Sequence, residues 1–305
     1  MIVALAGGVG AARFLEGVVQ VVAPEGVTAI VNTGDDIEMH GLHISPDVDI
    51  VTYTLAGIIE ETQGWGIRAD TTATMDMLTR LGGDAWFKLG DQDLAVHIRR
   101  SQRLREGATL SQVSDEIRRA LGVAVRILPM SNDPVRTHIQ TPAGLMHFQH
   151  YLVQRHAQDE VLGVVFEGAA QARPAPGVLE AIAQAEHILI APSNPIVSVG
   201  TILAVPGMRD ALQSTNAAIT AVSPIVGGAA IKGPAAPLMR ASGYEVSALG
   251  VAYCYHGLVD TLVIDNTDAA LADAIRALGM QVIITDTIMR GPKEKRALAL
   301  EALNR

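Results

Sequence analysis

Cysteine is nearly absent from this sequence. The single residue of this type, Cys254, excludes an intrachain disulfide framework and a zinc site built from several thiolates, and it favours a reducing compartment. Cys254 lies in the apolar run 251–255, where a thiol usually packs as a small buried side chain. Disulfide-rich and thiolate-metal proteins are therefore excluded as classes.

Long apolar runs are also missing. A membrane-spanning helix needs about 20 consecutive apolar residues, and no stretch of this chain approaches that length. The chain opens directly on MIVALAGG, without the positively charged segment and the small-residue cleavage site of a secretory signal. We therefore expect a cytoplasmic protein.

Positive charge is in deficit. The chain has 23 Lys and Arg against 32 Asp and Glu, which gives a net charge of −9. Nucleic acids and anionic membranes bind surfaces rich in Lys and Arg, so neither is an expected partner. An anionic small molecule would have to be met by local cations or by a metal ion.

What the sequence does contain is a series of short apolar runs, each followed by a turn rich in glycine or proline. The runs lie in MIVALAGG, TAIVNTGDD, AVRILPMSNDP, HILIAPSNP, AITAVSPIVGG and QVIITDT. Short runs of Val, Ile and Ala separated by helical spacers are typical of a parallel sheet that is buried on both faces. We predict an α/β fold with a doubly wound, mostly parallel sheet, in a single domain that spans residues 1–305.

Two segments depart from this alternation. Residues from about 56 to 120 carry three helical patterns, and the last of them begins at Thr109, with Gln112 placed to complete a capping box. A helical insertion is predicted there. Residues from about 135 to 166 alternate in polarity around a Pro-Ala-Gly turn, which predicts a β-hairpin excursion.

The loops after the apolar runs are the expected site, because ligands of doubly wound sheets bind at the carboxyl ends of the strands. In the first loop, LAGGVGAARFLEG, Gly8 and Gly10 open a helix and direct backbone N–H groups at an anion. No Gly-Lys-Ser/Thr follows, and Arg13 stands where a dinucleotide fingerprint has its third glycine. We predict a phosphate site here. A tight turn that needs its glycines only for packing is the alternative.

The second loop gathers negative charge. VNTGDDIEMHGLHISPDVDI, residues 31–50, contains Asp35, Asp36, Asp47 and Asp49. Several carboxylates beside a phosphate-binding loop would repel the ligand unless a divalent cation lay between them. The cluster therefore predicts a Mg²⁺ site, although any one of these aspartates could instead cap a turn or a helix.

Two further loops offer polar groups to a phosphate. APSNPIVSVG contributes Ser193 and Asn194, and VSPIVGGAAIKGPA contributes Gly227, Gly228 and Lys232. Hydroxyl, amide and backbone donors with one positive charge suit an anionic ligand. A G-x-S-x-G nucleophile elbow is missing, so covalent catalysis has little support.

Longer motifs give the sequence a family resemblance. They are GGVGAARFL, NTGDDIEMHGLHISPDVDIVTYTLAG, GWGIRADT, WFKLGDQDLAVHIRR, LPMSNDPVRT, ARPAPGVLEAI, APSNPIVSVG, SPIVGGAAIKGPA and DTIM. Together they resemble the phospholactate transferase family of deazaflavin coenzyme biosynthesis over essentially the whole chain. The resemblance implies a Rossmann-like core, a homodimer and a Mg²⁺-dependent enzyme. Such an enzyme passes a phospho-acid from a GMP-linked diphosphate to the terminal ribityl hydroxyl of the deazaflavin Fo and releases GMP.

The same resemblance implies roles for individual residues. Asp49 would contact the acceptor hydroxyl region of Fo, and Asp35 with Asp49 would hold Mg²⁺ against the diphosphate, with Asp36 as a reserve ligand. One of these carboxylates could accept the hydroxyl proton. Lys88 matches a position near Fo where many relatives carry Arg, and it keeps the charge without the planar fork. Trp86 could wall the flat deazaflavin ring or pack in the core.

The sequence is also compatible with other functions and with several donors. Distant relatives of this fold bind nucleotide sugars and act in regulation, so a non-catalytic nucleotide-binding protein is the alternative function. A nicotinamide oxidoreductase would need a third glycine and an acidic residue at the end of the second strand, where Arg13 and Asn32 stand. The donor could carry phospholactate, phosphoenolpyruvate or phosphoglycerate, which differ at a single carbon.

Overall fold

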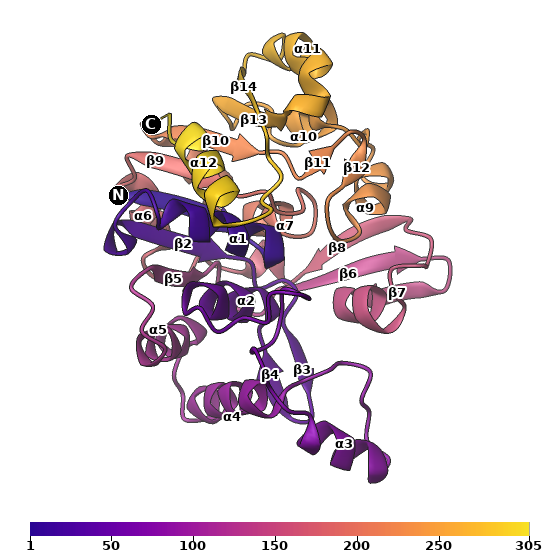
Figure 1. The fold of residues 1–305 in the computed structure, drawn as a ribbon. Coiled ribbons are helices and arrows are strands. Elements are labelled where there is room, and N and C mark those ends of the chain that lie inside the picture. The colour runs from indigo at the N-terminus through magenta and orange to yellow at the C-terminus, as the bar shows by residue number, and fades with distance from the viewer. Residues whose placement is uncertain (305) are drawn as a thin grey trace.

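A computed structural model describes residues 1–304. Its centre is a sheet of seven strands: β1 (Ile2–Ala6), β2 (Val27–Val31), β5 (Arg126–Pro129), β9 (His187–Ile190), β10 (Ala218–Val222), β13 (Thr261–Asp265) and β14 (Gln281–Thr285). The strand order is β14-β13-β10-β9-β1-β2-β5, and every neighbouring pair is parallel (Figure 1). This arrangement confirms the predicted doubly wound α/β fold.

The strands form because their short apolar runs are buried on both faces. In β1, Val3 and Leu5 join the core on one side of the sheet, while Ala4 and Ala6 join the core on the other side. Six of the seven strands coincide with the predicted apolar runs. The seventh, β13, was missed because its short run TLVID ends in a charged residue and lacks the Gly- or Pro-rich turn that marks the others.

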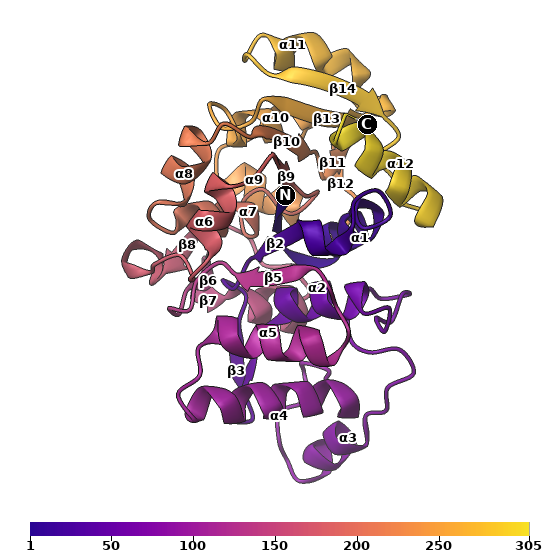
Figure 2. The same ribbon diagram turned by 90° about the vertical axis from the view of Figure 1, so that its left-hand side faces the viewer.

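Helices cover both faces of the sheet. On one face, α1 (Gly8–Val18) packs between α2 (Pro46–Leu55) and α12 (Pro292–Ala302). The core on the other face receives side chains from α6 (Val178–Ala183), α7 (Val199–Ala204), α8 (Met208–Ser214), α9 (Ala235–Ala241) and α10 (Ala248–Cys254). The short helix α11 (Ala272–Arg276) lies next to β14 at the end of the sheet (Figure 2).

The segment between β2 and β5 holds the predicted helices. It contains α3 (Ala73–Arg80), α4 (Asp91–Arg105) and α5 (Leu110–Ala120), and α5 begins with the expected capping box of Thr109 and Gln112. The segment also contains a hairpin that was not predicted, β3 (Ile37–Met39) with β4 (Leu42–Ile44). Its turn places His40 and Gly41 at positive φ angles of 53° and 70°, and its strands are too short for a clear alternation of polarity. With α3 and α4, this hairpin forms a lobe with a small core of its own (Figures 1 and 2).

The segment after β5 holds a second, antiparallel sheet. The predicted hairpin is present as β6 (Arg136–Thr141) and β7 (Gly144–His147), and β8 (Gly163–Glu167) pairs with the other edge of β6. Between β7 and β8 lies a π-helical turn, η2 (His150–Gln154). A two-residue hairpin, β11 (Ile225–Val226) with β12 (Ala229–Ala230), follows β10. Within residues 1–304, no helix combines the length and apolar character that crossing a membrane requires.

Candidate active site

A cavity of about 600 Å³ lies where the strand order reverses, between the carboxyl ends of β1 and β9. Loops diverge at such a switch point and leave a crevice for ligands. Most of the residues predicted for the site line this cavity: Gly8, Gly10, Arg13, Asp35, Asp49, Lys88, Ser193, Asn194 and Lys232. Loops that are far apart in sequence therefore meet in one space.

The glycine loop packs tightly against the loop after β9. The Gly7 N–H donates to Ser193 Oγ at 3.1 Å, and a Cβ atom on Gly10 would lie only 2.3 Å from the carbonyl oxygen of Pro192. Packing alone thus requires a glycine at position 10. Gly8 lines the cavity with a φ of 71°, a conformation that few other residues adopt. The loop therefore has both of the properties considered for it, close packing and backbone exposed to the cavity.

Asp35 and Asp47 are buried carboxylates beside this loop. Burial and repulsion by Asp47 hold the pKa of Asp35 well above its usual range. Burial also raises the pKa of Asp47 to about 7, although a hydrogen bond of 2.9 Å from Asn32 Nδ2 opposes the shift. Oδ1 of Asp35 is buried without a hydrogen-bond partner. An acceptor in this state fits a cation.

These two carboxylates do not form a complete metal site by themselves. Within residues 1–304, no group of three or more His, Cys, Asp or Glu side chains is arranged to hold a metal ion. Mg²⁺ commonly binds one or two carboxylates and takes its remaining ligands from water and substrate phosphates. The donor set present therefore fits Mg²⁺ together with a phosphate ligand.

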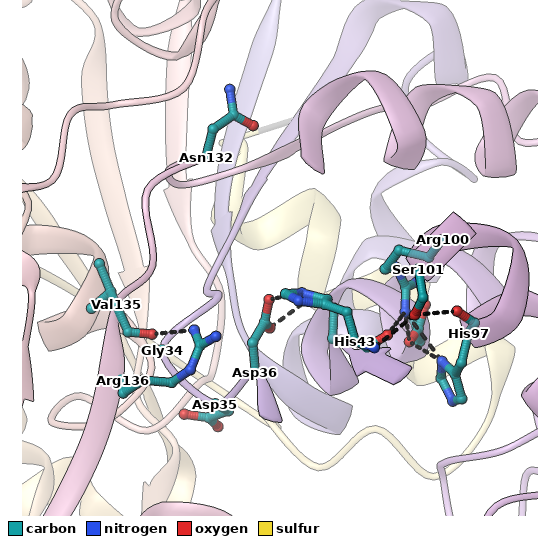
Figure 3. Close-up of polar contacts among 12 residues, drawn as sticks. Gly34, Asp35, Asp36, His43, His97, Arg100, Ser101, Asn132, Val135 and Arg136 are labelled. Atoms are coloured by element: carbon teal, nitrogen blue, oxygen red, sulfur yellow. Dashed lines mark hydrogen bonds and ion pairs between the residues drawn. The ribbon is translucent and has the colours of Figure 1, made fainter. Parts of the chain in front are cut away.

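Asp36 turns away from the cavity. Its Oδ2 lies 2.9 Å from His43 Nε2, and its Oδ1 accepts a hydrogen bond of 2.7 Å from Ser45 Oγ. Figure 3 shows the Asp36 carboxylate directed at His43. The side chain thereby ties the aspartate loop to β4 and to the start of α2.

Asp49 is held by a buried arginine. Arg100 Nη1 donates to Asp49 Oδ2 at 3.0 Å, and Arg100 Nη2 bonds Asp49 Oδ1. Burial raises the pKa of Asp49, and the charge of Arg100 opposes that shift. Both carboxylate oxygens are therefore fixed in direction by one planar fork.

The arginine belongs to a larger polar network on α4 that the sequence did not reveal. Arg100 Nη1 lies 3.2 Å from His97 Nδ1, and His97 Nε2 lies 3.2 Å from Asp93 Oδ1. Tyr53 donates to Asp93 Oδ1 at 2.7 Å, and Figure 3 shows His97 and Arg100 side by side on the helix. Positions 93, 97 and 100 share one helix face. The polar residues at this spacing were visible in the sequence and could have indicated the network. The same spacing is, however, typical of an exposed helix surface.

The two predicted cations contact the helical insertion. Arg13 Nη2 donates to the carbonyl oxygen of Glu61 at 3.4 Å, and Lys232 Nζ donates to that of Gln63 at 2.6 Å. Burial and the charge of Arg13 lower the pKa of Lys232. Residues 60–66 thus contact both cations, and Trp65 of this segment lines the cavity.

The remaining wall is aromatic and apolar. Phe87 and Phe148 line the cavity beside Lys88. Trp86 is not among the lining residues, because it packs at 5.6 Å between ring centroids against Phe87 and at 4.5 Å against His150. Trp86 therefore supports this wall from behind.

Gly227 and Gly228 also lie outside the cavity lining. They form the turn between β11 and β12, and the Gly227 N–H donates to the carboxylate of Asp268 at 3.1 Å. The loop after β14 contributes Thr287 to the cavity. It is positioned by Asp265, whose Oδ2 accepts bonds of 3.0 and 3.1 Å from the N–H and hydroxyl of Thr287.

Known proteins resemble this chain over nearly its whole length. A model of the family described as 2-phospho-L-lactate transferase CofD matches residues 2–299. A phosphoenolpyruvate transferase from Kitasatospora aureofaciens is 44% identical over 98% of this chain and 97% of its own. A 2-phospho-L-lactate transferase from Methanosarcina mazei is 41% identical over 96% of both chains. A solved structure of a UPF0052 family protein from Bacillus halodurans covers 97% of both chains with a TM-score of 0.66 and 18% identity; this last likeness concerns the fold alone.

Proposed function

The chain belongs to the 2-phospho-L-lactate transferase CofD family, and from this premise we propose the reaction that it catalyses. It transfers a phospho-acid from a GMP-linked diphosphate donor to the terminal ribityl hydroxyl of the deazaflavin Fo, and it releases GMP. The observation that carries the proposal is that one cavity combines three features. These are an anion-binding glycine loop, buried carboxylates that fit a cation, and an aromatic wall with a carboxylate held beside it.

The proposed cofactor is Mg²⁺. Asp35 with Asp47 would hold the ion, because both are buried beside the glycine loop and Asp35 Oδ1 has no partner. The pairing of Asp35 with Asp49 that the sequence suggested stays a prediction, and the Arg100 ion pair favours Asp47 over Asp49. Bound Mg²⁺ would supply charge neutralisation at the diphosphate.

Asp49 acts on the acceptor. The ribityl hydroxyl oxygen forms the new bond to the phosphorus that carries the acid, the bond from this phosphorus to the bridging oxygen breaks, and GMP leaves with that oxygen. The hydroxyl proton passes to Asp49, whose carboxylate has lone pairs left beyond those bonded to Arg100. Arg100 fixes the direction of the Asp49 carboxylate, which accepts this proton. Such positioning is the main contribution of a protein to phosphoryl transfer.

The substrates divide between the two ends of the cavity. Gly8, Arg13 and Lys232 face the diphosphate, and Ser193 and Asn194 support the same end. The wall with Phe87, Phe148 and Lys88 is suited to a flat ring of mixed polarity. The relatives named for phosphoenolpyruvate and for 2-phospho-L-lactate are almost equally similar to this chain, so both acids are candidate donors, with phosphoglycerate as a third.

We also propose a homodimer in the cytoplasm. The family resemblance supports the dimer. A cytoplasmic location agrees with the single, half-buried cysteine and with the lack of a spanning helix in residues 1–304.

A non-catalytic nucleotide-binding role is the second candidate. The likeness to the UPF0052 protein concerns the fold and does not decide between the two roles. What favours the transferase is the network of Asp49, Arg100, His97, Asp93 and Tyr53. A protein that only bound a nucleotide would have no need of a second buried carboxylate held beside an aromatic wall.

The deciding experiment is a fluorescence titration of the purified protein with Fo, in the presence and absence of GDP and Mg²⁺. Mass spectrometry then follows each GMP-linked donor in turn. Saturable Fo binding together with a new phosphodiester and free GMP is the expected result, and it names the donor. Guanine nucleotide binding without Fo binding would overturn the transferase in favour of the regulatory role.

A further inference from the structure

The loop that carries Asp35 is bonded by three consecutive carbonyl groups to a single neighbouring element. The carbonyl of Gly34 accepts from Thr137 N at 2.7 Å, that of Asp35 from Gln149 Nε2 at 3.3 Å, and that of Asp36 from His147 Nε2 at 3.2 Å. All three donors belong to the antiparallel sheet β7-β6-β8 or to the turn that follows β7. The contact is therefore continuous along the loop.

The packing between the two elements is as close as the bonding. A Cβ atom on Gly34 would lie 2.6 Å from Thr137 Oγ1 and 2.5 Å from Thr201 Cγ2, so the glycine allows the loop to rest directly on β6. Thr137 is fully buried. The loop cannot shift toward the sheet β7-β6-β8, and the three hydrogen bonds oppose a shift away from it.

The bonding pattern also fixes the state of His147. A carbonyl oxygen can only accept, so Nε2 of His147 carries the proton that it donates to Asp36 O. Nδ1 then accepts from Gln149 N at 3.2 Å. Gln149 contributes twice, through its backbone N–H to His147 and through its side chain to Asp35, and it is only 4% exposed.

On its other side, the same loop is held by the Asp36 side chain, which bonds His43 and Ser45. Between the two attachments, the carboxylate of Asp35 lies at the cavity with a buried, unpartnered Oδ1. Groups that hold the backbone of a metal ligand set its direction and so its affinity for the metal.

We propose that the excursion β7-β6-β8 is the support that aims Asp35 at the metal, with Gln149 and His147 as positioning residues. This inference rests on the proposed function, because it takes Asp35 as a metal ligand. It assigns a function to the sheet β7-β6-β8, for which the transfer chemistry alone gives no reason. Neither positioning residue needs to touch the metal.

The test is direct Mn²⁺ binding, measured from the electron paramagnetic resonance signal of free Mn²⁺ in the presence of GDP. Gln149→Leu removes the bond to the Asp35 carbonyl and keeps the side-chain volume. We expect its affinity for Mn²⁺ to fall about 10–100-fold, a larger loss than in its affinity for Fo, since Gln149 also lines the cavity. Gln154→Leu is the matched control, since Gln154 is exposed, belongs to the same turn, and its side chain bonds only His150 among the side-chain hydrogen bonds described for residues 1–304. It should bind Mn²⁺ like the wild type.

A second pair of variants keeps the test decisive if Gln149→Leu does not fold. His147→Phe retains a ring but loses both hydrogen bonds, whereas His147→Gln can still donate to Asp36 O. Weak Mn²⁺ binding in the first and partial rescue in the second supports the proposal. Wild-type affinity in Gln149→Leu or in His147→Phe overturns it, and so does a wild-type protein that binds no Mn²⁺. A wild type that binds Mn²⁺ but transfers no phospho-acid to Fo overturns the proposed function, and the comparison of variants still decides this inference.

Discussion

Two walls of the cavity carry buried carboxylates. Asp35 and Asp47 lie in the sheet wall, beside the glycine loop and the end of β2, and Asp49 lies in the insertion wall, which includes α4. Each of these three side chains is 5% exposed. At the same depth, they differ in what surrounds them. Asp35 has an oxygen without a partner, while both oxygens of Asp49 are bonded to Arg100. Burial raises the pKa in all three cases, and an arginine opposes the shift only at Asp49.

The difference separates two ways of using a buried charge. A carboxylate without a counter-charge lowers the stability of the fold, because its desolvation is not compensated until a cation binds. A carboxylate paired within the protein is compensated before any ligand arrives, and what it contributes is a fixed direction. The sheet wall is thus arranged to recruit a ligand, and the insertion wall is arranged to orient one.

The largest effect is expected from breaking the paired wall. Arg100→Leu leaves the charge of Asp49 buried and uncompensated, and removal of one partner from a buried pair costs about 3–5 kcal/mol. Urea denaturation of the variant should show this loss in the free energy of unfolding. The double variant Arg100→Leu with Asp49→Leu should recover most of it, because neither member of the pair remains charged and Asp93 keeps Tyr53 and His97 as partners. A loss below about 1 kcal/mol in the single variant would match an exposed pair and would remove the contrast between the walls.

The opposite wall should respond in the opposite way. Asp35→Asn removes a buried carboxyl that is repelled by Asp47 when ionised and has no counter-charge, so the metal-free protein should be as stable as the wild type or more stable. Turnover should nevertheless fall about 10²–10³-fold, which is the usual cost of losing one group that stabilises charge in the transition state. Single-turnover assays and thermal unfolding of the same preparation measure both quantities.

Chelation provides the control for this variant. Excess EDTA should abolish wild-type turnover and leave Fo binding intact, since the insertion wall, which is proposed to bind Fo, contains neither Asp35 nor Asp47. Turnover that persists in EDTA would contradict the role of the sheet wall. A clear drop in the stability of metal-free Asp35→Asn would show that Asp35 is already compensated by the protein.

The sequence predicted the sheet wall better than the insertion wall. The glycine loop and the aspartate loop follow directly from β1 and β2, and the end of a buried strand can be recognised from local periodicity. The outward turn of Asp36 could not be recognised, because its partners His43 and Ser45 depend on a hairpin that is only six residues of strand. Asp35 lies in the turn after β2 and Asp36 lies just before β3, and of the two only Asp35 lines the cavity.

The insertion wall depends on contacts that local patterns do not encode. Asp93, His97 and Arg100 look like the solvent face of an amphipathic helix, and they are buried only because α4 packs against β4 and the start of α2. Asp47 and Asp49 are two positions apart in the first turn of α2 and therefore point about 200° apart around its axis. This rotation sends one toward the glycine loop and the other toward α4. Prediction of that division requires the packing of α2, which is a tertiary property.

The smallest effect is expected at the rim of the insertion wall. Lys88 is exposed and lies next to Phe87, so its charge is partly screened by solvent and contributes modestly. Lys88→Ala should weaken Fo binding about tenfold, equivalent to about 1.4 kcal/mol, and should leave GDP binding unchanged. Fluorescence titration of each ligand measures the two affinities, and Lys88→Arg should retain Fo binding, since it keeps the charge and adds a planar fork. If Lys88→Ala weakened GDP and Fo equally, the cation would act on both substrates, and the two walls could not be assigned to separate ligands.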